Sequence, residues 1–214
     1  MAWVALGGIV AKLLLVRHSE TELNSSQRYW GKTDVGLGAI GLRQAEQLRD
    51  RLAAENIDHV YASKMQRAQV TAQTIASLHH LPVTGCPELN EIDFGDIEGL
   101  NFDEIHGKFP EVARMWIQRV PELAYPHGES LAQMEMRVAD FRRRLVKHAV
   151  GETVLIVAHA GILRSLICQL LELELPHRWN LRVDLASLSI VETYPNTAVL
   201  CLLNDTSHLI DKCK

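Results

Sequence analysis

The chain has little of what marks a protein that binds nucleic acids. Its 22 Lys and Arg residues are outnumbered by 26 Asp and Glu, for a net charge of −4, and no broad basic stripe runs along it. Binding to a phosphate backbone depends on clustered Lys and Arg side chains. We therefore expect no nucleic-acid partner.

Cysteine is equally sparse and has no pattern. The four cysteines form no C-x-x-C pair and have no zinc-ligand spacing with histidine, so they predict reduced thiols in a cytoplasmic protein rather than a disulfide or zinc framework. We expect no metal and no cofactor. The cysteines are Cys86, Cys168, Cys201 and Cys213.

No long hydrophobic run is present either. The apolar start, MAWVALGGIVAKLLLV, contains Gly7, Gly8 and Lys12, which makes it too short and too interrupted for a spanning helix. It also lacks the basic start of a signal peptide. We expect residues 1–10 to be a loose N-terminal extension, residues 11–214 to form one domain, and no membrane partner.

Strand-like and helix-like segments alternate along the remaining chain. Residues 11–16 and 153–159 are continuous apolar runs, which is typical of strands buried on both faces. Residues 87–128 are rich in Gly and Pro and predict a cap or rim. Further strands are expected at 57–63 and as a pair within 186–204, and helices at 41–54, 66–78, 130–149 and 161–171.

This order of elements predicts an α/β fold. Alternating strands and helices favour a three-layer α/β/α sandwich with a mostly parallel central sheet, and the last two strands favour an antiparallel edge pair. In such sheets the functional crevice lies beyond the carboxyl ends of the strands. The residues at those ends are therefore the first candidates for chemistry.

Two arginines and two histidines occupy these positions. Arg17 and His18 follow the first buried strand, Arg67 lies one helical turn after the second strand, and His159 ends the third. Two guanidinium forks with imidazole donors suit a dianion such as a phosphoryl group better than a lone carboxylate. Gly161 begins the next helix, whose free N–H groups would strengthen an anion site.

A neutral histidine in an anion pocket can also react. It can attack phosphorus to form a phosphohistidine, and a carboxylic acid can then protonate the leaving alkoxide. The acidic stretch at 88–99 offers five candidates for that acid, and spacing does not choose among them. They are Glu88, Glu91, Asp93, Asp96 and Glu98.

Five segments, in order, resemble the motifs of the histidine phosphatase superfamily, which includes cofactor-dependent phosphoglycerate mutase. RHSETELN (17–24) resembles R-H-G-[EQ]-[ST]-x-x-N, and SKMQRAQVTA (63–72) resembles S-x-L-x-R-A-x-x-T-A. LNEIDFGDIEG (89–99), HGES (127–130) and VAHAGILR (157–164) resemble L-x-E-x-x-F-G-x-x-E-G, G-E-S and V-x-H-G-G-x-x-R. The resemblance extends from about residue 11 to 209 and implies a phosphoglycerate mutase-like fold.

The resemblance also implies roles for individual residues. It makes His18 the phosphorylated nucleophile and Glu91 the general acid and base. The phosphoryl group would be bound by Arg17, Arg67 and His159, hydrogen bonds would come from Thr21 and Asn24, and Gly31 would lie in a substrate-facing loop. Ser19, Met65 and Ala160 depart from the motifs, and none of these departures removes a reacting group.

The mutase and phosphatase branches share the phosphohistidine and differ in what accepts the phosphoryl group. Mutases of the family carry a longer insertion after the acid and a C-terminal tail, which help to exclude water. Only 67 residues separate Glu91 from His159 here, which favours hydrolysis of a small phosphomonoester. The mutase reaction, and more remotely a non-catalytic phosphate-binding module, are the alternatives.

The segment around PHGES and the compact middle resemble α-ribazole phosphatase of cobalamin biosynthesis and broad-specificity bacterial phosphatases. An aromatic or sugar leaving group would then meet rim residues, although each of these also fits an ordinary surface position. A homodimer paired through the last strands is a further expectation. The rim candidates are Arg28, Tyr29, Trp30, Trp116, Arg119 and Tyr125.

Overall fold

The computed structural model describes residues 10–209. Its centre is a six-stranded sheet in the order β3-β2-β4-β1-β5-β6. The neighbours β3, β2, β4 and β1 pair in parallel, whereas β5 is antiparallel to both β1 and β6. The strands are β1 (Ala11–Arg17), β2 (His59–Ser63), β3 (Val83–Cys86), β4 (Glu152–Ala158), β5 (Leu188–Tyr194) and β6 (Thr197–Asp205).

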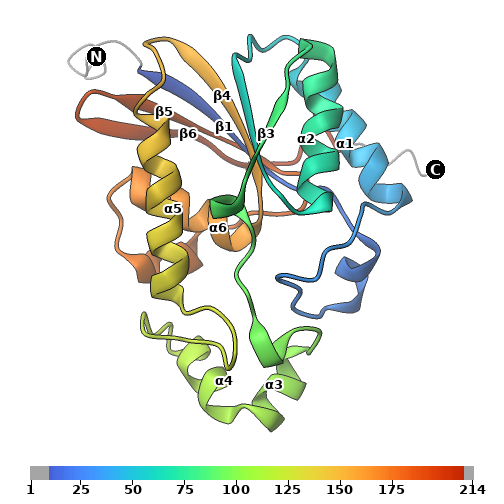
Figure 1. Cartoon of the computed structure of the whole chain (residues 1–214), viewed down its shortest axis with the longest axis vertical. Helices are drawn as coiled ribbons and strands as arrows, with labels where there is room; N and C mark the ends of the chain where they lie inside the picture. The colour runs from blue at the N-terminus through green and yellow to red at the C-terminus, as the bar shows by residue number, and fades with distance from the viewer. Residues whose placement is uncertain (1–9, 210–214) are drawn as a thin grey trace.

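Helices cover both faces of this sheet, with α1 and α2 on one side and α5 and α6 on the other (Figure 1). The predicted three-layer α/β/α sandwich, with a mostly parallel sheet and an antiparallel edge pair, is confirmed. The helices are α1 (Ala39–Leu52), α2 (Gln66–Ala76), α3 (Phe102–Lys108), α4 (Pro110–Ile117), α5 (Leu131–Leu145) and α6 (Ala160–Leu170).

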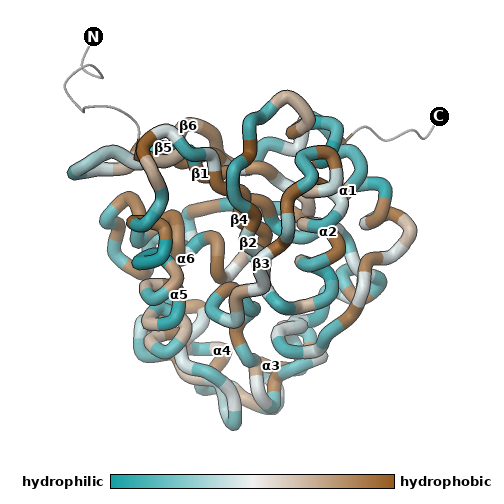
Figure 2. The backbone as a smooth tube through the Cα atoms, turned by 45° about the horizontal axis from the view of Figure 1, so that its top comes forward, coloured by the Kyte–Doolittle hydropathy of each residue, from teal (hydrophilic) through white to brown (hydrophobic). Residues whose placement is uncertain are grey.

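The uniformly apolar sequence of β1 follows from its place between the two helical layers. Leu13 and Leu15 belong to the cluster under α5 and α6, whereas Leu14 and Val16 belong to the cluster under α1 and α2. Successive strand side chains point to opposite faces, so a strand covered on both faces needs apolar residues throughout. The apolar colour of the central strands in Figure 2 shows the same arrangement.

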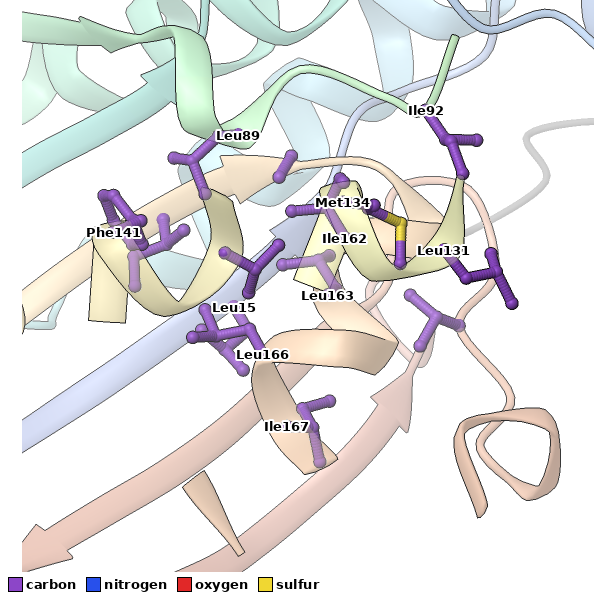
Figure 3. Packing of buried hydrophobic residues seen from close by; sticks show 14 of the residues in the cluster. Leu15, Leu89, Ile92, Leu131, Met134, Phe141, Ile162, Leu163, Leu166 and Ile167 are labelled. Atoms are coloured by element: carbon purple, nitrogen blue, oxygen red, sulfur yellow. The ribbon is translucent and has the colours of Figure 1, made fainter. Parts of the chain in front are cut away.

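The first of these clusters fixes α5 and α6 to the sheet. Leu15 of β1 lies beside Leu166 of α6, and Phe141 and Met134 approach from α5 (Figure 3). All four side chains are at most 1% exposed. Truncating such a buried leucine to alanine costs about 2 to 5 kcal/mol, so the strand ends are held on a rigid base.

Residues 87–128, where the sequence predicts a cap or rim, contain short helices. Helices α3 and α4 lie together at the lower end of the molecule in Figure 1. The strand β3 is missing from the sequence prediction; its four residues, VTGC, include a glycine and give no alternating pattern. The expected extension at 1–10 lies outside the described residues except for Val10. Every helix within residues 10–209 is too short or too polar to cross a lipid bilayer.

Candidate active site

The two histidines predicted from the sequence meet at the carboxyl ends of two neighbouring strands. β1 and β4 are parallel with Arg17 opposite Ala158, so the residues that follow them, His18 and His159, are neighbours. The His18 N–H donates to the Ala158 carbonyl at 2.9 Å, and the two ring centroids lie 5.0 Å apart. Both side chains are buried, at 5% and 0% exposure. The strand register thus produces the predicted pair.

His18 is held as a neutral ring in one tautomer. Its Nδ1 lies 2.8 Å from the Ser19 carbonyl, which only accepts, so Nδ1 carries the proton and Nε2 keeps its lone pair. Burial lowers the pKa of His18 well below its usual range, and the charges of Arg17 and Arg67 lower it further. The ring is therefore a neutral imidazole with a free Nε2 lone pair rather than an imidazolium at neutral pH.

His159 is oriented by a chain of hydrogen bonds that begins at a backbone amide. The Lys64 N–H donates to Asn90 Oδ1 at 2.9 Å, which identifies that atom as the oxygen. The Ser63 hydroxyl donates to the same oxygen at 3.0 Å and accepts from His159 Nε2 at 2.8 Å. His159 thus carries its proton on Nε2. Burial and then the neighbouring His18 and arginines lower its pKa well below the usual range.

The arginines are anchored by backbone carbonyls. Arg67 donates at 2.8 Å to the carbonyls of Thr33 and Gly31, and its Nε lies 3.4 Å from His159 Nδ1. Arg17 donates to the Val183 carbonyl at 2.8 Å, and its buried Nε has no hydrogen-bond partner within residues 10–209. Burial lowers the pKa of Arg17 to about 10, which still leaves it cationic at neutral pH.

Gly31 lies behind Arg67. It is buried and is not among the residues that line the pocket, and a Cβ added to it would come within 2.0 Å of the Ile92 carbonyl oxygen. Its backbone N–H donates to Glu98. The structure therefore gives Gly31 a contact with Arg67, while its predicted contact with substrate stays a prediction.

Glu91 faces the same pocket from the cap segment. Its carboxylate is 3.4 Å from the N–H of Gly161, in the first turn of α6, and accepts from the Ile92 N–H at 3.0 Å. A Cβ on Gly161 would come within 2.6 Å of Glu91 Oε1. Glycine at this position therefore leaves the room that the Glu91 carboxylate occupies.

Thr21 and Asn24 also line the pocket, and they bond to each other. The backbone N–H and the hydroxyl of Thr21 both donate to Asn24 Oδ1, at 2.8 and 2.9 Å. Ser19 keeps a negative φ, so a side chain is tolerated where the family motif has Gly, and its N–H donates to Thr71 Oγ1 at 3.1 Å. The loop after β1 is thus fixed by local hydrogen bonds.

The phosphoryl end is one part of a cavity of about 760 Å³, whose other part has an aromatic wall. Tyr29 and Trp116 lie 4.6 Å apart between ring centroids, and Trp116 lies 6.3 Å from Trp179. Five of the six predicted rim residues line this cavity; Arg119 does not, and donates to Asn180 instead.

Two further arginines of the cavity wall carried no role in the sequence analysis. Arg164, the last residue of VAHAGILR, donates to the Leu181 carbonyl at 2.8 Å. Arg178 is 5% exposed, contacts Met134 Sδ at 4.0 Å and lies 4.7 Å from the Trp179 ring centroid. Within residues 10–209, neither has a carboxylate at ion-pair distance, and the same holds for Arg17 and Arg67. The cavity is lined by five arginines and three carboxylates, so positive charges are in excess.

Comparison with known proteins places these residues in a family. The family model described as histidine phosphatase superfamily (branch 1) matches residues 13–206. Phosphoserine phosphatase 1 of Hydrogenobacter thermophilus is 35% identical, with 94% of this chain and 95% of that protein covered. The metal-independent phosphoserine phosphatase of Arabidopsis thaliana is 31% identical, with 94% and 84% covered.

A solved structure gives the same result for the fold. The crystal structure of the α-ribazole phosphatase from Shigella flexneri superposes with a TM-score of 0.83 at 32% identity, covering 91% of this chain and 96% of that one. The phosphoglycerate mutase-like fold expected from the motifs is therefore confirmed.

Proposed function

The chain belongs to the histidine phosphatase superfamily and is a phosphoric monoester hydrolase, and from this premise we propose that it acts through a phosphohistidine at His18 without a metal ion. One observation carries the proposal: the Ser19 carbonyl holds the His18 proton on Nδ1, which leaves the Nε2 lone pair for phosphorus. The orphaned Nε–H of Arg17 beside it suits a phosphoryl oxygen.

The first step forms the P–N bond and breaks the P–O bond of the ester. His18 Nε2 attacks phosphorus while Arg17 and Arg67 donate to the phosphoryl oxygens. His159 also donates to them when the bound dianion brings a proton to its Nδ1, the ring nitrogen that does not contact Ser63. Glu91, as the carboxylic acid, gives its proton to the departing alkoxide oxygen. The alcohol leaves, and the phosphoryl group stays on His18.

The second step returns the enzyme to its starting state. Glu91, now a carboxylate, takes a proton from water, whose oxygen attacks phosphorus as the P–N bond breaks. Inorganic phosphate leaves, His18 is neutral again and Glu91 is protonated again. The two Thr21 hydrogen bonds to Asn24 Oδ1 orient the Asn24 amide nitrogen, which donates to the phosphoryl group. The Gly161 N–H bonds Glu91 and becomes a donor to the phosphoryl group when that carboxyl moves to the leaving group.

Chelation and removal of the nucleophile test this scheme. With p-nitrophenyl phosphate as substrate, activity should be unchanged in excess EDTA and should fall at least about 10⁴-fold in His18→Ala. The exposed surface variant His106→Ala serves as the matched control and should retain full activity. Loss of activity on chelation, or an active His18→Ala enzyme, contradicts the proposal.

The role of Glu91 is tested by varying the leaving group. Glu91→Gln should slow hydrolysis of alkyl phosphates far more than that of p-nitrophenyl phosphate, because nitrophenolate leaves without a proton. Asp96→Asn, in the same acidic stretch, is the control and should slow neither substrate. Equal losses on both substrates count against general acid catalysis by Glu91.

The choice between hydrolysis and mutase activity is tested directly. The short segment between Glu91 and His159 and the phosphatase names of the relatives both favour hydrolysis. Phosphate release and phosphoglycerate interconversion are measured side by side on 3-phosphoglycerate. Efficient interconversion would contradict the proposed phosphatase.

Two features of the cavity point to different leaving groups. The wall of Tyr29, Trp116 and Trp179 suits an aromatic leaving group such as that of α-ribazole 5′-phosphate. Arg164 and Arg178 suit a leaving group with a carboxylate, such as that of phosphoserine, because a buried guanidinium without an anionic partner is stabilised by one. We favour the carboxylated substrate on this ground.

A substrate panel separates the two. Phosphoserine and 3-phosphoglycerate should have higher kcat/KM than phosphoethanolamine, and Arg178→Met should remove that preference. If α-ribazole 5′-phosphate is preferred and Arg178→Met leaves the order unchanged, the aromatic wall determines the substrate.

We also propose a cytoplasmic enzyme that forms a homodimer through the β6 edge of the sheet. The free thiols of Cys86 and Cys168 support the location. The position of β6 at the sheet edge supports the pairing. Sedimentation over a range of protein concentrations tests the dimer, and a monomer at all concentrations contradicts it.

A further inference from the structure

A second pair of histidines lies at the amino ends of the central strands, opposite the carboxyl ends where His18 and His159 lie. His59 begins β2, Glu152 begins β4, and His148 lies in the turn that follows α5. Since a strand rises about 3.3 Å per residue, Glu152 is about 20 Å from the His159 end of β4. This cluster takes no part in the phosphatase site.

The two imidazoles converge on one oxygen of the Glu152 carboxylate. Glu152 Oε2 lies 2.9 Å from His148 Nδ1 and 3.3 Å from His59 Nε2. One ligand atom from each of the three lies within 4.8 Å of the others. The rings of His59 and His148 are 4.5 Å apart between centroids.

These spacings are close to those of a tetrahedral metal site. Zinc binds histidine nitrogen and carboxylate oxygen at about 2.0 to 2.2 Å, so neighbouring ligand atoms in a tetrahedron are about 3.3 to 3.6 Å apart. The distances from Glu152 Oε2 to the two nitrogens, 2.9 and 3.3 Å, need to lengthen by only a few tenths of an ångström. Two imidazoles and a carboxylate are ligands that zinc accepts.

The surroundings of the cluster orient its ligands. The Tyr61 hydroxyl lies 3.2 Å from His148 Nε2 and can accept the proton of that nitrogen when Nδ1 binds an ion. The Ala149 N–H donates to Glu152 at 3.0 Å. Such hydrogen bonds to the outer atoms of metal ligands fix the tautomer and the carboxylate position. The His59 side chain is 43% exposed, so an ion can enter from solvent.

We propose that His59, His148 and Glu152 form a binding site for a divalent transition metal ion of the Zn²⁺ class, with water as fourth ligand. The bound ion links the turn after α5 to the starts of β2 and β4. It stabilises the fold without taking part in hydrolysis, because it lies at the other end of the strands.

Metal titration of tag-free, EDTA-treated and desalted protein tests the site. Zn²⁺ binding is followed by calorimetry, and Co²⁺ binding by the visible absorption of its tetrahedral complex. We expect one equivalent in the wild type and at least about 100-fold weaker binding in His59→Ala and Glu152→Gln, since even the loss of an outer hydrogen bond costs 10- to 100-fold. The control His106→Ala should bind as the wild type does.

Thermal unfolding and activity give independent readouts. Zn²⁺ should raise the Tm of the wild type but not that of His59→Ala, because only the folded wild type binds it tightly. His59→Ala should keep full phosphatase activity in EDTA, which separates this site from the proposed catalytic one. Equal Zn²⁺ affinity in wild type and His59→Ala, or binding that persists in His59→Ala and disappears in His18→Ala, overturns the proposal.

Discussion

The two histidine pairs of this molecule have similar ring geometry and opposite surroundings. The rings of His18 and His159 are 5.0 Å apart and tilted by 58°, and those of His59 and His148 are 4.5 Å apart and tilted by 51°. The first pair is buried between arginines, whereas the second contacts a carboxylate and meets solvent. From this contrast we expect an anion beside the first pair and a cation beside the second.

Apart from removal of His18 itself, the largest expected effect comes from changing Arg67, which contacts His159 of the buried pair, while keeping its charge. Arg67→Lys retains a cation but loses the planar fork that bonds the carbonyls of Gly31 and Thr33. We expect kcat/KM to fall about 10²-fold or more, the cost of losing one well-placed donor. Steady-state kinetics on p-nitrophenyl phosphate measures it.

The matched control is Arg142→Lys on the exposed face of α5, which should change nothing. Full activity of Arg67→Lys would mean that positive charge alone, rather than the guanidinium geometry, distinguishes the first pair from the second.

A smaller effect is expected from the hydrogen-bond chain behind His159. Ser63→Ala removes the acceptor for His159 Nε2 and leaves the ring free to turn. We expect kcat to fall about 10-fold, as for other outer-shell partners of histidine, with a smaller change in KM. Ser63→Thr, which keeps the hydroxyl, should restore activity; failure of that rescue assigns the loss to packing instead.

The smallest expected effect is on stability and concerns protonation of the buried pair. The pKa of His18 is lowered in the folded state, chiefly by burial, so below about pH 6.5 the unfolded chain takes up a proton that the folded chain does not. The free energy of unfolding should then fall as pH falls, by up to about 1.4 kcal/mol per pH unit for each such histidine.

Urea unfolding of wild type and His18→Gln at pH 7.5, 6.5 and 5.5 measures this slope. The variant lacks one titrating ring and should lose less stability per pH unit than the wild type. Parallel slopes would show that His18 is not kept neutral by the fold, and the contrast between the two pairs would then rest on their neighbours' charge alone.

The sequence predicted the anion-binding site because three of its residues directly follow apolar strands. Arg17, His18 and His159 stand directly behind runs that only a doubly covered strand explains, and parallel strands bring such ends together. The choice of Glu91 among five acids came from the family resemblance, because spacing along a loop does not report which side chain faces a cavity.

The rest depends on contacts between distant segments. Arg178 lies on a short 3₁₀ turn with no apolar periodicity, so nothing in its neighbourhood marks it as buried in the cavity wall. His59 and His148 come from segments far apart in the chain and meet through the β2–β4 register and the length of α5. The strand β3 is short and partly exposed, and its apolar pattern is too weak to identify it.

Gly31 sets the spacing between the phosphoryl-binding Arg67 and the segment that carries Glu91. One side of this residue holds Arg67 through a carbonyl, and the other lies against Ile92, the neighbour of Glu91. A single methyl group at position 31 would therefore wedge the phosphoryl end of the pocket away from the proton donor. Substitutions at position 31 would slow turnover although this residue does not contact the ester. The position therefore limits how far residues 87–128 can change shape while Glu91 stays close to the phosphoryl group.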